Sequence, residues 1–342
     1  MIDGLVSIDA IREASVRIRP LARVTPLLEV TDVTGDVEPP GPLFLKCENL
    51  QRSGAFKIRG AVNMMLRLTE SDRARGVITF SSGNHGVAMS LAARLLGVPA
   101  VVVMPTTAPA VKVESARRLG AEIVFEGTTT IERKIRTEQL AAERGLTIVP
   151  PFDHEWIVAG QGTIGLEILE QCPQVSAVYV PASGGGMIAG VATAIKSLNR
   201  TVRIIGVEPA GANRMTRSLH AGRPVTLESA SGIADGLLAV RPGDITFRHV
   251  QAYVDDMITV DDEAIARAVR WLFDHARLVV EPSGAATVAA VLGRHNASWS
   301  RDGAASMTVP AGSPTVAVLS GGSVDATAYG RYIAGPLGTG SR

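Results

Sequence analysis

The sequence predicts an α/β protein built from two αβα domains with mainly parallel, twisted sheets. Short β-branched runs alternate with segments of helical periodicity, and this order places helices over both faces of parallel sheets. With 342 residues, 46% of them hydrophobic, the chain is long enough to form two cores. The runs expected to form buried strands are 76–80, 100–105, 121–126, 177–182, 203–209 and 315–322.

Helical segments lie between these runs. Residues 85–97 end on Gly97, a residue type common after helix C-termini. Residues 261–278 begin with acidic side chains and carry apolar residues at helical spacing. We expect loops at 35–42 and 296–314. The strands fall into two blocks, near 76–126 and near 177–322, which suggests two domains.

Composition excludes several classes of function. Lysine plus arginine total 34 and aspartate plus glutamate total 33, so the balance of charge favours neither nucleic acid nor an acidic membrane surface as a partner. We see no apolar stretch of membrane-spanning length and no signal peptide. Two cysteines, Cys47 and Cys172, do not suggest a disulfide framework. We therefore expect a soluble, cytoplasmic protein.

Three glycine-rich turns follow predicted strands. They are SSGNHG (81–86), SGGGMIAG (183–190) and LSGGSVD (319–325). Open α/β sheets bind ligands at the carboxyl edge of their parallel strands. Glycines let backbone N–H groups approach an anion, and a helix N-terminus adds the positive end of its dipole. The turns predict a bound phosphate or carboxylate.

One of these turns also fits a dinucleotide site. Gly184, Gly186 and Ala189 match G-x-G-x-x-G/A, and Glu208 ends a following strand, where an acid would bind a ribose hydroxyl. An NAD-dependent oxidoreductase is therefore an alternative, although it gives no role to residues 51–61 or 81–86. The sequence contains no Walker A loop, zinc-binding helix or G-x-S-x-G elbow.

The stretch QRSGAFKIRGA (51–61) raises the question of what Lys57 does. Small residues around it would let a backbone approach a ligand, and Phe56 could exclude water. A lysine held in an apolar pocket has a lowered pKa and can act as a nucleophile. Taken alone, the stretch favours the other possibility, a solvated lysine whose stem lies on Phe56.

Taken in order, the motifs point to one family. KCENLQRSGAFKIRGA, SSGNHG, AGQGTIGLEI, SGGGMIAG, GVEP, IADGL, VVEPSGA and LSGGSVD follow one another along the chain. The chain resembles the fold-type II (tryptophan synthase β-like) pyridoxal-phosphate enzymes, in the branch of serine/threonine dehydratases and serine racemases, over roughly residues 10–330. The resemblance implies a large domain (1–75 and 151–332), a small inserted domain (76–150), a C-terminal tail (333–342) and pyridoxal 5'-phosphate (PLP) in the cleft between the domains. It also implies a homodimer or homotetramer.

The resemblance assigns roles to individual residues. Lys57 would form the Schiff base with the cofactor and then take the Cα proton. Phe56 would lie against the cofactor, Asn84 would bind its 3-hydroxyl oxygen, and Ser320 would face its pyridine nitrogen. The phosphate would be held by Ser183, Gly184, Gly185, Gly186 and Met187. The substrate carboxylate would lie among Ser81, Ser82, Gly83 and His85, and Ser82 could also serve as a second catalytic group.

The implied reaction is β-elimination from L-threonine or L-serine, which yields a 2-oxo acid and ammonia. A serine hydroxyl at position 320 cannot keep the pyridine nitrogen protonated, which favours prompt loss of a β-leaving group over transamination. One alternative is racemisation of serine, in which Ser82 would act on the opposite face of Cα. Another is dehydration of a different substrate, such as 3-hydroxyaspartate. A binding or regulatory protein that has lost catalysis is a further alternative, against which the presence of Lys57 and Ser320 argues.

A cation site is a further expectation. Some relatives bind a divalent cation through the glutamate of GVEP and an aspartate six residues later, whereas this chain has Glu208 and Arg214 at those positions. A cation held by Glu208 and the carbonyl of Ala212 is one possibility. Pairing of Glu208 with an arginine is the other.

Overall fold

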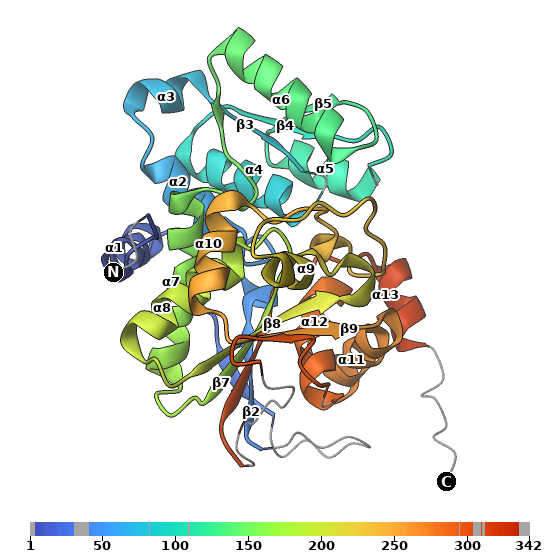
Figure 1. Ribbon diagram of the computed structural model, residues 1–342. Coiled ribbons are helices and arrows are strands. Elements are labelled where there is room, and N and C mark those ends of the chain that lie inside the picture. Colours follow the sequence, from blue (N-terminus) through green and yellow to red (C-terminus); the bar gives the residue numbers. More distant parts are fainter. Residues whose placement is uncertain are drawn as a thin grey trace.

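Two sheets organise the computed structural model, which describes residues 4–30, 41–81, 83–108, 110–293, 295–303, 309 and 312–334 (Figure 1). The larger sheet has the strand order β1-β2-β11-β7-β8-β9-β10 and the smaller one β5-β4-β3-β6. The larger sheet contains β1 (Leu27–Glu29), β2 (Leu43–Cys47), β7 (Ala177–Pro181), β8 (Arg203–Pro209), β9 (Asp256–Val260), β10 (Trp299–Ser300) and β11 (Thr315–Leu319). The smaller contains β3 (Val77–Phe80), β4 (Ala100–Met104), β5 (Glu122–Phe125) and β6 (Thr147–Ile148).

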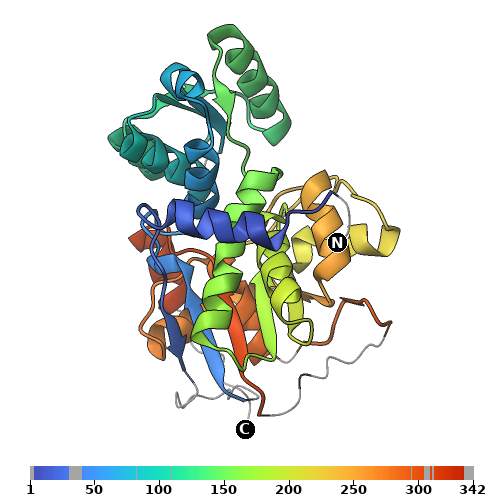
Figure 2. The same cartoon turned by 90° about the vertical axis from the view of Figure 1, so that its left-hand side faces the viewer.

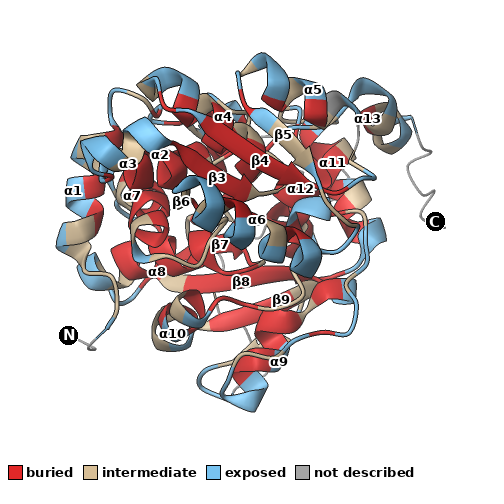
Figure 3. Cartoon of the chain, turned by 90° about the horizontal axis from the view of Figure 1, so that it is seen from above, coloured by how far each residue is buried: buried red, intermediate tan, exposed pale blue. Residues whose placement is uncertain are grey.

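The strands are parallel except at the edges of the larger sheet. There β1 pairs with β2, and β10 with β9, in antiparallel register. Within β11, Val316 and Val318 pack on one face of the sheet while Ala317 and Leu319 pack on the other. Both faces are therefore buried, as expected for parallel strands covered by helices. Figure 3 shows these buried strands lying among helices with exposed outer surfaces.

Helices cover both faces of each sheet (Figures 1 and 2). On the larger sheet, α11 (Asp262–Asp274) and α12 (Pro282–Leu292) cover one face, and α7 (Glu155–Gln171), α8 (Gly186–Leu198), α9 (Arg214–Ala221) and α10 (Asp244–Tyr253) the other. On the smaller sheet, α2 (Ile58–Leu66), α4 (Asn84–Leu96) and α5 (Ala110–Arg118) oppose α6 (Thr130–Arg144). The remaining helices are α1 (Ile8–Ile18), α3 (Glu70–Arg75), α13 (Ala326–Ile333) and the short 3₁₀ turns η1 (Glu48–Leu50), η2 (Ala210–Ala212) and η3 (Asp235–Leu237).

This architecture confirms the predicted α/β fold with mainly parallel sheets. Every strand of the smaller sheet lies between residues 77 and 148. The predicted domains, 1–75 with 151–332 and 76–150, stay a prediction. The predicted tail, 333–342, lies outside the described residues from position 335 onward. None of the described helices is both long and apolar enough to span a membrane.

The strands β2 and β9 were not predicted. Lys46 interrupts the apolar run of β2, yet its side chain is buried because it pairs with Glu167. The prediction of a loop throughout 296–314 was wrong in part, because this segment contains the short edge strand β10. Residues 304–308, 310 and 311 of that loop, and most of the loop predicted at 35–42, lie outside the described residues. The helix expected to reach 278 ends at Asp274, because Arg277 adopts a left-handed backbone with φ 57°.

Candidate active site

The segments that carry Lys57 and Ser320 lie side by side although they are far apart in the sequence. The segment around Ala55 forms a bridge with Gly321. On either side of this bridge, the N–H of Phe56 donates to the carbonyl of Ser320 (3.1 Å) and the N–H of Gly322 to that of Gly54 (2.9 Å). The turn before α2 is thereby fixed to the carboxyl end of β11, at the sheet edge where open α/β folds bind ligands.

The side chain of Lys57 is half-buried, and its amine contacts the loop between β6 and α7. Its Nζ donates to the carbonyl of Pro151 (2.6 Å) and lies 5.1 Å from the centroid of the Phe56 ring. Burial disfavours the charged form and lowers the pKa of Lys57 to about 8. Of the two possibilities left open by the sequence, this geometry favours the reactive lysine.

Asn84, at the start of α4, connects the smaller lobe, which is the part of the chain built on the smaller sheet, to the segment after β11. Its Nδ2 donates to Oε1 of Glu281 (2.6 Å), and the N–H of Glu281 donates to the carbonyl of Gly321 (3.1 Å). Burial, and then the nearby carboxylate of Asp235, raise the pKa of Glu281 to about 8. The sequence analysis gave Glu281 no role, although it lies within the VVEPSGA motif.

His85, in the first turn of α4, is buried and neutral. Its Nε2 lies 3.0 Å from the carbonyl of Val149, which can only accept, so Nε2 carries the hydrogen. Desolvation, followed by the charge of Lys57, lowers the pKa of His85 to about 3. Its expected place beside a substrate carboxylate stays a prediction, since its single N–H already donates to Val149.

The other predicted carboxylate ligands lie where β3 leads into α4. The Oγ of Ser81 accepts a hydrogen bond from the N–H of Gly83 (3.2 Å). A Cβ at Gly83 would meet no atom within 4 Å, so this turn borders open space. Ser82 lies outside the described residues.

The turn between β7 and α8 forms a cradle of backbone N–H groups. Gly185 has a left-handed backbone with φ 99°, and a Cβ at Gly184 would lie 2.4 Å from the Phe152 ring. Within the described part of the chain, the N–H groups of residues 184–187 find no acceptor in the protein. Four such groups at a helix N-terminus suit a phosphate. Because Phe152 follows Pro151, the cradle and Lys57 share one wall.

The two predicted cation ligands are engaged by protein groups. Glu208 is buried and accepts hydrogen bonds from the N–H groups of Met215 and Thr216, each 2.9 Å long. The carbonyl of Ala212 accepts from the guanidinium of Arg214. Among the described residues, no group of three or more His, Cys, Asp or Glu side chains could hold a metal ion.

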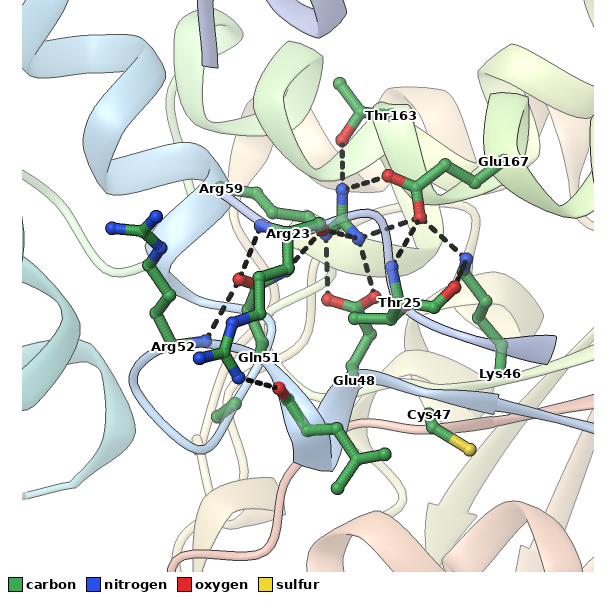
Figure 4. Close-up of polar contacts among 12 residues, drawn as sticks. Arg23, Thr25, Lys46, Cys47, Glu48, Gln51, Arg52, Arg59, Thr163 and Glu167 are labelled. Carbon is green, nitrogen blue, oxygen red and sulfur yellow. Dashed lines mark hydrogen bonds and ion pairs between the residues drawn. The ribbon is translucent and has the colours of Figure 1, made fainter. Parts of the chain in front are cut away.

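A buried network of charges lies behind the Lys57 turn (Figure 4). Arg59 donates to both carboxylate oxygens of Glu48 (2.8 and 2.7 Å) and to Glu167 (2.6 and 2.9 Å). Lys46 also donates to Glu167 (2.6 Å). These four side chains connect α2 to β2, η1 and α7, so they hold the first turn of α2 in place. This network was not predicted from the sequence. Charged residues within otherwise apolar segments could have indicated it.

Comparison with known proteins identifies the family. A family model described as "Pyridoxal-phosphate dependent enzyme" matches residues 18–321. The chain belongs to this family. The resemblance inferred from the motifs is thereby confirmed, and so is PLP as the cofactor of an enzyme. The dinucleotide alternative is wrong, and the structure gives a reason, because Glu208 is buried against α9 and not free to bind a ribose.

The similar proteins are named for two different activities. The chain is 41% identical over 315 residues to a serine racemase of Oryza sativa subsp. indica, covering 91% of this chain and 92% of the relative. It is 39% identical over 332 residues to L-threonine ammonia-lyase of Thermotoga maritima, covering 96% and 78%. The structure of maize serine racemase matches with a TM-score of 0.88 and 40% identity, covering 96% of this chain and 97% of that one.

The residues around Lys57 fit the cofactor of this family. The lysine of lowered pKa and the Ser320 hydroxyl lie on paired segments. The four N–H groups without protein acceptors share with Lys57 the wall at residues 151–152. With PLP bound, they would supply the reactive amine, the anion cradle and the partner of the ring nitrogen.

Proposed function

We propose that this enzyme catalyses PLP-dependent β-elimination from L-threonine and L-serine, releasing ammonia with 2-oxobutanoate or pyruvate. The observation that carries the proposal is the desolvated Lys57 amine, with a pKa of about 8, on a segment whose backbone is hydrogen-bonded to Ser320. The identity with a threonine ammonia-lyase supports the same reaction.

Lys57 acts as the general base. Bound PLP withdraws electrons from the substrate Cα, which makes its proton removable. An amine with a pKa of about 8 is partly neutral near pH 7 and can accept that proton. The neutral His85 close to Lys57 adds no positive charge that would push the amine toward complete deprotonation.

Ser320 selects elimination. Its buried hydroxyl lies 3.4 Å from the carbonyl of Ser283 and carries no charge. A hydroxyl cannot keep a pyridine nitrogen protonated, so negative charge at Cα is only weakly stabilised. A β-hydroxyl that leaves promptly removes this charge, whereas transamination would require it to persist.

The remaining predicted residues position cofactor and substrate. The N–H groups of Gly184, Gly185, Gly186 and Met187, with the Ser183 hydroxyl, bind the phosphate. Asn84 binds the 3-hydroxyl, and Phe56 lies against the ring. The beginning of α4, with Ser81, Ser82, Gly83 and His85, holds the substrate carboxylate. The positive end of the helix dipole supports that binding.

Serine racemisation is the second candidate, supported by the 41% identity with a serine racemase. Racemisation needs a proton donor on the face of Cα opposite Lys57, a role that we assign to Ser82. Dehydration of 3-hydroxyaspartate is a third possibility.

One assay separates these activities. PLP-loaded enzyme is incubated with L-threonine, L-serine or 3-hydroxyaspartate, and 2-oxo acid and D-serine are both quantified. We expect 2-oxo acid from L-threonine and L-serine and none from the Lys57→Ala variant. D-Serine formation without 2-oxo acid would replace the lyase by the racemase. No product from any substrate would contradict both.

We also propose that the enzyme is a cytoplasmic homodimer or homotetramer that acts on a small amino acid. No membrane-spanning helix occurs among the described residues, and the family acts on small amino-acid substrates. Light scattering of the purified holoenzyme measures its mass; a monomer would contradict the oligomer.

A further inference from the structure

A fully buried arginine lies behind the glycine cradle. Arg214 begins α9 and is 0% exposed. Its Nη2 donates to the carbonyl of Ala182 (2.9 Å), its Nε to that of Ser183 (3.2 Å) and its Nη1 to that of Ala212. All three donor nitrogens of the guanidinium are therefore used on backbone carbonyls.

The counterion of Arg214 is equally fixed. Oε1 of Glu208 lies 3.7 Å from Nε of Arg214, and both side chains are fully buried. The Glu208 carboxylate also accepts the N–H groups of Met215 and Thr216 and the Thr216 hydroxyl. Three carbonyls and one carboxylate thus surround a single positive charge. A buried ion pair contributes little net stability, so its purpose is better sought in what it orients.

Two of the carbonyls held by Arg214, those of Ala182 and Ser183, lead directly into the cradle. In a planar trans peptide, the C=O of one residue and the N–H of the next point in opposite directions. Holding the Ser183 carbonyl therefore directs the Gly184 N–H away from Arg214. The carbonyl of Gly184 is held in turn by the Thr246 hydroxyl (2.6 Å) and the Gly243 N–H (3.1 Å), which directs the Gly185 N–H.

We propose that Arg214 is a positioning residue for the anion cradle. Its guanidinium occupies a shell of oxygens that would otherwise suit a metal ion. Through the Ser183 carbonyl it orients the first N–H group of the cradle, that of Gly184, and it makes this orientation independent of added metal. The expected cation at Glu208 and Ala212 is then the guanidinium itself. The proposal rests on the assignment of residues 184–187 to the phosphate.

Removal of the guanidinium provides the test. Arg214→Ala leaves a carboxylate and three carbonyls, the hard oxygen ligands that Mg²⁺ and Ca²⁺ prefer. The dissociation constants of PLP and of inorganic phosphate, the latter by competition, are measured on the apoenzyme with EDTA, with millimolar Mg²⁺ or Ca²⁺, and with guanidinium chloride. Arg217→Ala is the matched control, because Arg217 is exposed on the same helix.

The wild type and Arg217→Ala should bind both ligands with equal affinity in EDTA and in metal. Arg214→Ala should bind both at least about tenfold more weakly in EDTA and recover most of this loss when Mg²⁺, Ca²⁺ or guanidinium is added. A merely structural role would not produce rescue by an ion. The proposal would be overturned if Arg214→Ala bound phosphate as tightly as the wild type does. It would also be overturned if the wild type needed a metal ion to bind PLP or phosphate.

A second variant covers misfolding of Arg214→Ala. Arg214→Lys keeps the charge but lacks the planar fork that spans three carbonyls. It should fold, bind phosphate more weakly than the wild type and show no response to divalent cations. Phosphate affinity equal to that of the wild type would contradict a role for the fork. If the wild type itself does not bind phosphate competitively with PLP, the assignment of the cradle fails instead.

Discussion

At the scale of single residues, burial decides which side chains near Lys57 change charge at neutral pH. The pKa of His85, lowered to about 3, keeps the imidazole neutral. Lys57 and Glu281, whose pKa values both lie near 8, are the groups that titrate close to the working range. Lys57 reaches this value by losing solvation of an ammonium and Glu281 by losing solvation of a carboxylate.

The lowered pKa of Lys57 predicts how cofactor capture depends on pH. Attack on the PLP aldehyde needs the neutral amine. The neutral fraction, and hence the rate, should rise about tenfold per unit below the pKa and level off above pH 8. Stopped-flow absorbance of the apoenzyme mixed with PLP measures this rate, and Lys57→Ala should show no covalent capture.

Glu281→Gln identifies the group that titrates. Glutamine can still accept the hydrogen bond from Asn84 but has no proton to lose near pH 8. The midpoint of the profile should therefore be unchanged in this variant. A midpoint near 10.5, the ordinary value of a lysine, would contradict the buried amine.

At the scale of elements, the cradle requires glycine at position 185. Its φ of 99° strains any other residue, and a Cβ there would lie 2.7 Å from Oγ1 of Thr246. Because Thr246 also holds the Gly184 carbonyl, a shift would disturb the whole turn. Gly185→Ala should weaken PLP binding at least about tenfold in a fluorescence titration.

Gly222→Ala is the matched control for this change. Gly222 ends α9 with φ 67°, and a Cβ there meets no atom within 4 Å. This variant should lose about 1 kcal/mol of unfolding free energy through backbone strain and bind PLP normally. Equal loss of PLP affinity in both variants would show that strain alone, and not the cradle, is responsible.

The buried network behind Lys57 makes a second prediction at this scale. Glu167→Gln leaves Lys46 and Arg59 with one carboxylate, Glu48, between them. An uncompensated buried charge costs about 3–5 kcal/mol, and urea denaturation should show a loss of that size. Glu138→Gln, at an exposed i,i+4 pair with Lys134, should change stability by less than about 0.5 kcal/mol. Similar losses in the two variants would contradict the role of burial.

The same elements show what could be predicted from the sequence. Periodicity predicted most of the buried strands and helices, and the motifs predicted Lys57, Asn84, the cradle and Ser320, which the structure brings together. Strand β2 was missed because Lys46 is charged, and only its partner on α7 makes that charge tolerable. Arg214 likewise acts on carbonyls, which sequence patterns do not display.

At the scale of the whole molecule, the lobe built on the smaller sheet lies above the lobe built on the larger sheet (Figure 1). Besides the Asn84–Glu281 contact, an ion pair joins them. Nζ of Lys112, on α5, lies 2.6 Å from Oδ2 of Asp235, on η3. This pair is partly exposed, so its strength should depend on salt. It helps to hold the two lobes together next to the Asn84–Glu281 contact.

Reversing one charge of this pair should therefore affect the binding of substrate more than its chemistry. Lys112→Asp should raise KM for the preferred amino acid about two- to tenfold and leave kcat within about twofold, as expected for loss of a pair worth about 1 kcal/mol. The double variant Lys112→Asp with Asp235→Lys should restore KM, and high salt should reduce the difference between variants. Lys134→Asp, a surface change on α6 of the same lobe, is the control. If Lys134→Asp raises KM equally, or if the double variant does not restore KM, the net charge of the surface, and not this ion pair, governs the binding of substrate.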